Sequence, residues 1–359
     1  MASVYIHIPF CERKCKYCSF VSYSELGKID NYIVRLCEEI RACNIIDIDT
    51  LYIGGGTPSL LNACQLKSIM GALAKHNMSP NCEFTIECNP NSLTREKLLL
   101  YKDIGVNRIS VGAQSLCDNV LSCIGRLHNG MQALQAVKQA SKIFDNVSVD
   151  LILGLPFQTW DMLKCDIESL APYVEHFSIY SLMVEDGTAL ERMVANGEIA
   201  LPDEDACVDM YDNALTLLRR LGFERYEVSN FTKSKPSRHN LAYWTGIDYY
   251  GFGVASHSFV DGVRYSNTEN LDEYLQGITI INKYSLNLQQ KKEEYIMLGL
   301  RTAKGISLDY MQKRFGESVN MHALKKLQNA DLINCINDHV ALTDKGFHLL
   351  NAIVLELIS

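Results

Sequence analysis

Several features that would place a protein in a membrane, outside the cell or on nucleic acid are missing from this chain of 359 residues. No apolar run approaches the roughly 20 residues that a membrane-spanning helix requires. The N-terminus opens on an apolar stretch, without the charged region and cleavage site of a signal peptide. The formal net charge is −8, so there is no basic field to attract nucleic acid or anionic lipid. These absences predict a cytoplasmic protein that binds neither nucleic acid nor a membrane.

Disulfides are not expected either, because many cysteines without a secretion signal indicate a reducing compartment. Three of the 13 cysteines, Cys11, Cys15 and Cys18, are closely spaced in the run CERKCKYC. The spacing is Cys-x3-Cys-x2-Cys, and no fourth cysteine follows closely. Three thiolates can hold three corners of a [4Fe–4S] cluster and leave the fourth iron open. The run therefore predicts catalysis or ligand activation at iron.

Zinc is the alternative metal for this segment. His7 lies four residues before Cys11, so a tetrahedral Cys3His site is possible. His7 belongs to the run SVYIHIPF, whose alternating side chains predict a strand. A strand histidine is more often packed or solvated than bound to a metal. The spacing favours iron–sulfur, and a structural zinc protein stays open as another interpretation.

Short apolar runs alternate with amphipathic stretches over the first 180 residues. The predicted strands are Val4–Ile8, Thr50–Gly54, Glu83–Cys88, Arg108–Gly112, Val147–Leu153 and His176–Tyr180. The predicted helices are Ile29–Ala42, Ala63–Lys75, Thr94–Asp103, Met131–Ile143 and Thr159–Leu170. Such alternation indicates an α/β fold with a parallel sheet covered by helices. Six units are too few for a complete eight-stranded barrel, so we expect a partial, TIM-like (β/α)6 barrel or a doubly wound sheet.

The rest of the chain has a different character. A helix is predicted over Asp205–Leu221, and the aromatic and glycine-rich stretch Arg225–Asn267 is hard to assign. From Lys291, three helices followed by a small hairpin predict a winged-helix-like module. This tail is not strongly basic, so packing or partner binding is preferred over DNA binding. We expect a core over residues 1–235, a loop-rich connecting segment over 236–290 and the winged-helix-like domain over 291–359.

Polar motifs follow the ends of the predicted strands. Cys11, the GGGTP turn at 54–58, Glu87, Gln114 and Asp150 lie at or near these ends. Ligand sites of parallel α/β folds lie at this edge, so we expect one site there. Consecutive glycines let a backbone approach a ligand closely, although a tight strand-to-helix turn is an alternative reading. Glu87 is placed to accept hydrogen bonds from ribose hydroxyls; the alternative is a solvated or salt-bridged carboxylate.

The combination of motifs closely resembles the radical S-adenosylmethionine (radical SAM) superfamily. The residues that carry this resemblance are CERKCKYC, GGGTP, IECNP and RISVGAQS. Within the superfamily, the chain resembles the oxygen-independent coproporphyrinogen dehydrogenase family. The motifs that carry this resemblance are YIHIPFC, GGGTPSLL, ECNPNS, IGRLHN, VDLILGLP and SRHNLAYW. The resemblance covers essentially the whole chain, including the C-terminal module.

The resemblance implies roles for individual positions. Cys11, Cys15 and Cys18 would ligate the [4Fe–4S] cluster, and SAM would chelate the open iron through its amino and carboxylate groups. One electron from the cluster would cleave the sulfonium of SAM to a 5′-deoxyadenosyl radical. The positions implied to contact SAM or to lie beside the cluster are Tyr5, Tyr17, Gly55, Gly56, Thr57, Glu87, Gln114, Arg126 and Asp150.

Departures from the dehydrogenase pattern indicate a branch of the family. Phe20 stands where the dehydrogenases carry an extra cysteine, and the chain lacks their N-terminal extension. With SRHNLAYW, this resembles the heme-chaperone branch, which implies binding of heme and its transfer to an unidentified acceptor protein. The alternative is oxidative decarboxylation of the propionates of coproporphyrinogen III, so we leave open whether the chain is an enzyme. Phe157 replaces a family glycine and is expected to alter only a loop.

The resemblance also singles out the SRHNLAYW segment as a heme contact. Trp244 and Tyr243 offer flat apolar surface, and His239 is a side chain of a type that ligates heme iron. The alternative for His239 is a histidine satisfied by hydrogen bonds in a packed loop. His257 is a weaker candidate for the same role.

Overall fold

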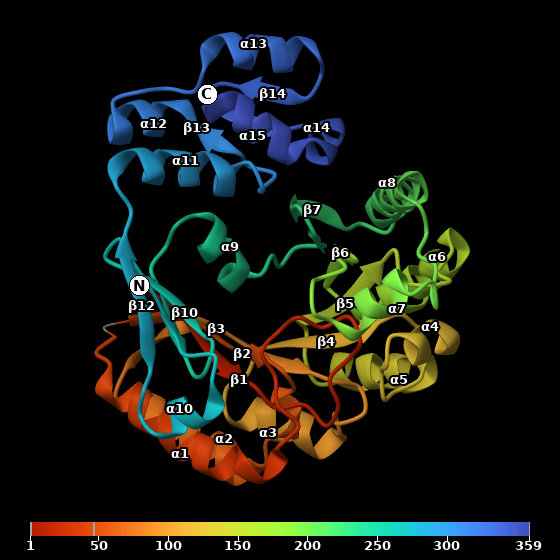
Figure 1. Ribbon diagram of the computed structural model, residues 1–359, viewed down its shortest axis with the longest axis vertical. Helices are drawn as coiled ribbons and strands as arrows, with labels where there is room; N and C mark the ends of the chain where they lie inside the picture. Colours follow the sequence, from red (N-terminus) through yellow and green to blue (C-terminus); the bar gives the residue numbers. More distant parts are fainter. Residues whose placement is uncertain (1, 46, 359) are drawn as a thin grey trace.

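The computed structural model describes residues 2–45 and 47–358. Its centre is a twelve-stranded sheet in the order β12-β11-β10-β9-β1-β2-β3-β4-β5-β6-β8-β7 (Figure 1). The six strands predicted from the sequence are consecutive in this sheet and parallel. They are β1 (Ala2–Ile8), β2 (Asp47–Gly55), β3 (Asn77–Cys88), β4 (Arg108–Gln114), β5 (Val147–Leu153) and β6 (His176–Ser181). The predicted partial (β/α)6 barrel is thereby confirmed.

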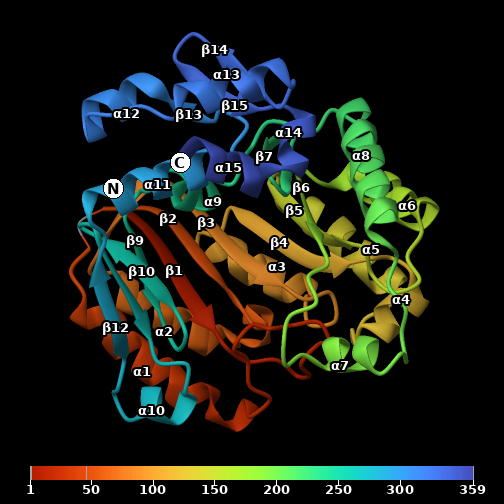
Figure 2. The same ribbon diagram turned by 45° about the horizontal axis from the view of Figure 1, so that its top comes forward.

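Helices cover the convex face of the sheet (Figures 1 and 2). They are α1 (Ile29–Ala42), α2 (Ala63–Leu73), α3 (Arg95–Asp103), α4 (Asp118–Cys123), α5 (Gly130–Ser141) and α6 (Trp160–Leu170). Their bounds follow local chemistry, since the side chains of Thr94, Asn129 and Thr159 cap the first turns of α3, α5 and α6. The buried residues of α1 recur at the three-to-four-residue spacing of an amphipathic helix.

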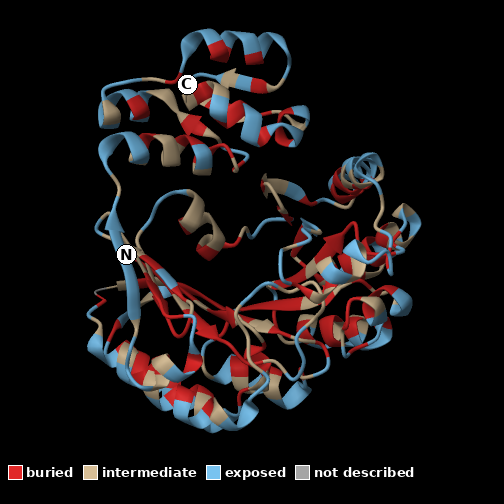
Figure 3. Ribbon diagram, viewed as in Figure 1, coloured by how far each residue is buried: buried red, intermediate tan, exposed pale blue. Residues whose placement is uncertain are grey.

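The two faces of the parallel strands differ in chemistry. Along β4, Ile109, Val111 and Ala113 are completely buried in the core against the outer helices. The alternate residues Arg108 and Ser110 line a cavity on the concave side. Figure 3 shows burial concentrated on the strands and on the inward faces of the helices. The concave side therefore carries the polar side chains.

Residues 236–290, expected to be rich in loops, instead extend the sheet. After α7 (Ala189–Ala195) and α8 (Glu204–Arg220), the chain forms β7 (Glu224–Glu227), β8 (Asn230–Thr232), α9 (Arg238–Trp244), β9 (Tyr249–Phe252), β10 (His257–Val260), β11 (Val263–Asn267), α10 (Leu271–Leu275) and β12 (Ile280–Ser285). β9 pairs parallel with β1, and β10 to β12 follow antiparallel. These strands have four to six residues, too few for an alternating pattern to stand out. The domain boundaries stay a prediction.

The C-terminal segment packs as a unit on the concave side of the sheet (Figure 1). It consists of α11 (Leu288–Gly299), β13 (Ile306–Ser307), α12 (Leu308–Phe315), α13 (Met321–Asn329), β14 (Ile333–Ile336), β15 (His339–Leu342), α14 (Asp344–His348) and α15 (Leu350–Ile358). The three helices and hairpin match the predicted elements, and the segment has its own apolar core. Arg225, in β7, connects this segment to the rest of the chain. Its Nη2 donates to Asp344 Oδ1 at 2.6 Å, and its guanidinium lies over the ring of Phe347.

Within residues 2–45 and 47–358, the structure contains no helix of the length and apolar character needed to span a membrane.

Candidate functional site

A cavity of about 510 Å³ lies on the concave side of the parallel strands. Its walls come from β1 to β6, the loop after β1, the turn after β2 and α9. Most site residues predicted from the sequence line it: Tyr5, Cys11, Cys15, Tyr17, Cys18, Gly55, Gly56, Thr57, Glu87, Gln114, Arg126, Asp150 and His239. The fold thus brings the predicted residues together, while their individual roles stay predictions.

The three cysteines lie on the loop that follows β1. The hydroxyl of Thr57 donates to Cys11 Sγ at 3.4 Å, and Arg126 Nη1 donates to Cys15 Sγ at 3.5 Å. Burial raises the pKa of the Cys11 and Cys18 thiols, so these groups stay neutral until a metal displaces their protons. Three thiols from one loop, opening into one cavity, fit the donor set of a cluster with one open iron.

The zinc alternative is not supported by the contacts of His7. Its Nδ1 lies 3.0 Å from the hydroxyl of Tyr5, and its Nε2 lies 3.2 Å from the carbonyl of Val21. Burial lowers the pKa of His7 to about 4, so the ring is neutral. In the described part of the chain, no group of three or more His, Cys, Asp or Glu side chains is arranged to hold a single metal ion.

The glycine-rich turn after β2 is both a tight turn and a cavity wall. Gly55 has a φ of +110°, and a Cβ there would lie 2.5 Å from Cε1 of His7. A Cβ on Gly56 would lie 2.8 Å from the carbonyl of Phe10. Side chains are therefore excluded from the turn, and its backbone forms the surface of the cavity.

Glu87 is held from two sides at the end of β3. Its Oε1 accepts from the hydroxyl of Tyr52 at 2.7 Å, and its Oε2 accepts from the backbone N–H of Gly55 at 2.9 Å. Burial raises the pKa of this carboxyl to about 7. The alternative of a freely solvated or salt-bridged carboxylate does not match these contacts.

Three further predicted residues have constrained geometry at the cavity. Gln114 has a φ of +66°, a left-handed conformation that is uncommon outside glycine and is often found at functional sites. Arg126 Nη2 donates to Asn89 Oδ1 at 2.8 Å and to the carbonyl of Gly112 at 2.6 Å, while its buried Nε has no partner in the described structure. Burial raises the pKa of Asp150. An arginine with a donor to spare fits the carboxylate end of a ligand such as SAM.

His239 lies at the start of α9 and forms part of the wall. Its side chain is 2% exposed. Nδ1 bonds the hydroxyl of Thr50 at 2.7 Å, Nε2 bonds the hydroxyl of Tyr243 at 2.9 Å, and the ring stacks on Tyr52. Burial lowers the pKa of His239 to about 3. Ligation of iron would require one of these bonds to break, so the geometry matches the alternative of a satisfied histidine.

Of the other candidates for heme contact, Tyr243 lines this cavity, whereas Trp244 and His257 do not. Trp244 is half-buried, with the guanidinium of Arg301 5.6 Å from its ring centroid. His257 is exposed on β10.

Arg108 and His176 are among the buried lining residues that sequence reasoning missed. His176 is 1% exposed and bonds the hydroxyls of Ser148 at 2.8 Å and Tyr226 at 2.9 Å. A single histidine at the start of a strand carries no sequence signal for this position. Arg108 opens the motif RISVGAQS, and a charged residue beginning a buried strand was the signal that could have identified it.

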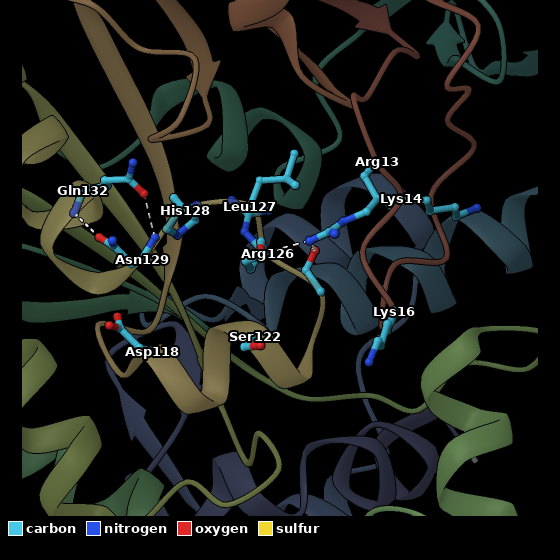
Figure 4. Close-up of a pocket in the computed structure, with 11 residues that line it drawn as sticks. Arg13, Lys14, Lys16, Asp118, Ser122, Arg126, Leu127, His128, Asn129 and Gln132 are labelled. Atoms are coloured by element: carbon cyan, nitrogen blue, oxygen red, sulfur yellow. Dashed lines mark hydrogen bonds between the residues drawn. The ribbon is translucent and has the colours of Figure 1, made fainter.

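The mouth of the cavity, where the lining residues are exposed, differs from its floor, where lining residues such as His239 and His176 are buried. Phe20 and Met183 line it with side chains that are 68% and 69% exposed. Arg13 and Lys14 also line it, and they border a neighbouring cavity of about 640 Å³. Figure 4 shows Arg13, Lys14 and Lys16 along one loop beside the segment 126–132. Two basic side chains, Arg13 and Lys14, therefore lie at the entrance of a protein whose net charge is −8.

Comparison with family models gives two matches. The model of the radical SAM superfamily matches residues 5–170, which include the cysteine loop and β1 to β5. The model of the HemN C-terminal domain matches residues 286–349.

Curated relatives match along nearly the whole chain. The heme chaperone HemW of Lactococcus lactis is 37% identical, over 97% of this chain and 95% of the relative. HemW of Bacillus subtilis is 35% identical over 96% of each chain. A bovine radical S-adenosyl methionine domain-containing protein 1, mitochondrial, is 32% identical over 100% of this chain and 87% of its own. Among solved structures, coproporphyrinogen III oxidase (HemN) from Escherichia coli covers 100% of this chain and 90% of its own, with a TM-score of 0.86 and 21% identity.

Proposed function

We propose that this protein, which belongs to the HemW family within the radical SAM superfamily, binds heme and delivers it to an acceptor protein. The observation that carries the proposal is identity along the chain: relatives named heme chaperone HemW are 32–37% identical over nearly full length. Phe20, at the position of the extra cysteine of the dehydrogenase pattern, supports the same branch. The acceptor protein is not identified by any feature of the chain.

The family implies SAM and a [4Fe–4S] cluster, and the cavity suits both. Cys11, Cys15 and Cys18 would hold the cluster, and Arg126 would hold the carboxylate of SAM. Glu87 would accept from the ribose hydroxyls, because it lines the cavity and its carboxylate oxygens are held in place by Tyr52 and Gly55. When bound, the cluster and SAM supply one-electron chemistry that no side chain offers. The residues of this chain would bind and orient these groups.

Decarboxylation of coproporphyrinogen III is the second candidate function. The fold of the E. coli coproporphyrinogen III oxidase covers the whole chain, and this favours a similar architecture. At 21% identity, that likeness bears on the fold alone. The enzyme proposal therefore rests on the shared architecture and motifs.

One sample distinguishes the two functions. The protein is purified without oxygen, its cluster is reconstituted, and it is titrated with heme while the Soret absorption is followed. The same preparation, with SAM and a reductant, is then incubated with coproporphyrinogen III. We expect heme to bind and coproporphyrinogen III to stay intact. Turnover to protoporphyrinogen would overturn the chaperone proposal, and absence of heme binding would do so independently.

A further inference from the structure

Arg108 is a buried cation without a protein partner. It begins β4, is 3% exposed and lines the main cavity. Its Nε is buried and makes no hydrogen bond in the described structure. Among residues 2–45 and 47–358, no side-chain hydrogen bond or ion pair joins its guanidinium to another residue. A buried charge without a counter-charge is costly, so such a group is a strong indication of a missing anion.

The carboxyl groups nearest to Arg108 are engaged elsewhere. Glu87 accepts from Tyr52 and from the backbone of Gly55. Asp150 accepts from the hydroxyl of Ser110 at 3.2 Å. Burial raises the pKa of both carboxyls, and the charge of Arg108 acts in the opposite direction. Neither carboxyl forms a hydrogen bond or ion pair with Arg108 in the described structure, so its guanidinium is free to pair with a carboxylate of a ligand.

The position of Arg108 separates it from the end of the cavity that holds the cysteines. Side chains alternate along a strand, so Arg108, Ser110 and Gln114 share the concave face. Arg108 and Gln114 begin and end β4, six residues or roughly 20 Å apart. The single carboxylate of SAM, when held by Arg126 near Cys15, leaves Arg108 without an anion. A second ligand with its own carboxylate fits the far end.

We infer that Arg108 binds a propionate carboxylate of the tetrapyrrole cargo. This inference rests on the proposed function, and it implies an orientation for the bound tetrapyrrole. The propionate edge points to the far end of the cavity, at Arg108, and the rest of the ring points toward the opening. The recognised chemistry is a tetrapyrrole macrocycle with ionised propionates, which heme and coproporphyrinogen III share. A planar guanidinium offers the bidentate geometry that a carboxylate prefers.

The test compares heme with heme dimethyl ester, which lacks the ionised carboxylates. Wild-type protein should bind heme about ten- to a hundredfold more tightly than the ester, the range for a charge-assisted hydrogen bond. Arg108→Met should remove this preference and leave binding of the ester unchanged. Arg108→Lys should keep part of it, because the charge stays and the bidentate geometry is lost. Arg264→Met is the matched control, since Arg264 pairs with Glu294 away from the cavity.

Thermal unfolding separates this role from a structural one. Because Arg108 has no protein partner, Arg108→Met without ligand should unfold no earlier than wild type, while its stabilisation by heme should shrink. Equal preference for heme over the ester in wild type and Arg108→Met would overturn the inference and leave the chaperone proposal standing. Failure of wild type to bind heme, with binding of coproporphyrinogen III that depends on Arg108, would overturn the chaperone proposal and support the propionate site.

Discussion

The floor of the cavity is buried, polar and hydrogen-bonded, whereas its mouth is exposed and carries apolar side chains. On the floor, His239 and His176 are buried, and each uses both ring nitrogens in hydrogen bonds to hydroxyl groups. At the mouth, Phe20 and Met183 lie on loops, exposed over about two thirds of their surface. The polar groups of these two histidines hydrogen-bond to neighbouring side chains of the protein, whereas the apolar side chains at the mouth remain accessible to a ligand.

This difference matches two classes of ligand. A resident cofactor gains from a wall whose side chains are held in place before it binds, because less order has to be imposed on binding. A large cargo that must leave again is better served by flexible, unpaired surface such as a methionine thioether. Apart from Arg108, which we infer to bind the cargo, changes of buried lining residues should alter cofactor binding and stability, whereas changes at the mouth should alter only cargo binding.

The largest expected effect concerns the cysteine loop. Cys15→Ala should abolish the cluster while the chain stays folded, because two thiolates do not hold a cubane cluster with an open iron stably. Anaerobic iron and sulfide analysis measures this directly. Cys37→Ala, in the buried face of α1, is the control and should keep full iron content. A full complement of iron in Cys15→Ala would contradict the assignment.

His239→Ala tests the floor as a structural element. The change leaves Thr50 and Tyr243 without a partner and removes a stacked ring, so the free energy of unfolding should fall by about 2–4 kcal/mol. Denaturant unfolding measures the loss. His257→Ala, on an exposed position, should change it little. If His239→Ala is as stable as wild type and loses heme instead, the residue acts as a heme ligand after all.

Glu87→Ala should weaken SAM binding with the cluster retained. Loss of one hydrogen bond to a charged group costs about 1.5–3 kcal/mol, or roughly ten- to a hundredfold in affinity. Calorimetry on the reconstituted protein measures the change. Asp103→Ala, at the outer end of α3, serves as the matched carboxylate control. An unchanged affinity would remove Glu87 from the SAM site.

Glu87 also predicts how stability depends on pH. Its pKa is raised to about 7 in the folded protein from an ordinary value of 4.5, so the folded state binds the proton more tightly. Stability of the ligand-free protein should therefore fall as pH rises between these two values and level off above 7, by on the order of 3 kcal/mol. Denaturant unfolding at pH 5 and pH 8 shows the slope. Glu87→Gln should flatten it, and an unchanged slope in that variant would point to another group.

The smallest effects are expected at the mouth. Phe20→Ser and Met183→Leu should each weaken heme binding by a few fold, since partly exposed contacts contribute about 1 kcal/mol or less. SAM affinity, cluster content and stability should stay at wild-type values. Met131→Leu, 75% exposed on α5 outside the cavity, is the control for Met183. A loss of SAM binding in Phe20→Ser would show that floor and mouth are not independent.

Most of the parallel core was predictable because each of its elements is long enough to show a period. Strands β1 to β6 have six to twelve residues and contrast with amphipathic helices such as α1. Strands β9 to β12 were not found, since they are short and separated by glycine-containing turns. The boundaries of α2, α3, α5 and α6 came within a few residues of prediction.

Site residues that belong to a local sequence motif could be predicted from the sequence. Site residues that belong to no such motif could not. The cysteine spacing and the glycine run are local patterns with a chemical meaning. Arg108 and His176 owe their position to strand alternation and to partners distant in sequence, such as Tyr226. The contacts of His239 with Thr50 likewise join residues 189 positions apart, which no local pattern encodes.

Tyr226, in the four-residue strand β7, connects the cavity to the C-terminal domain. Its hydroxyl bonds His176 at 2.9 Å, and its carbonyl accepts from the backbone N–H of Ala303 at 2.9 Å. The neighbouring Glu227 forms a bridge with Thr302. A single residue thus joins the wall of the cavity to the C-terminal segment through one hydrogen bond on each side. A shift of residues 302–303 would therefore reach the wall of the cavity at His176 through the side chain of Tyr226.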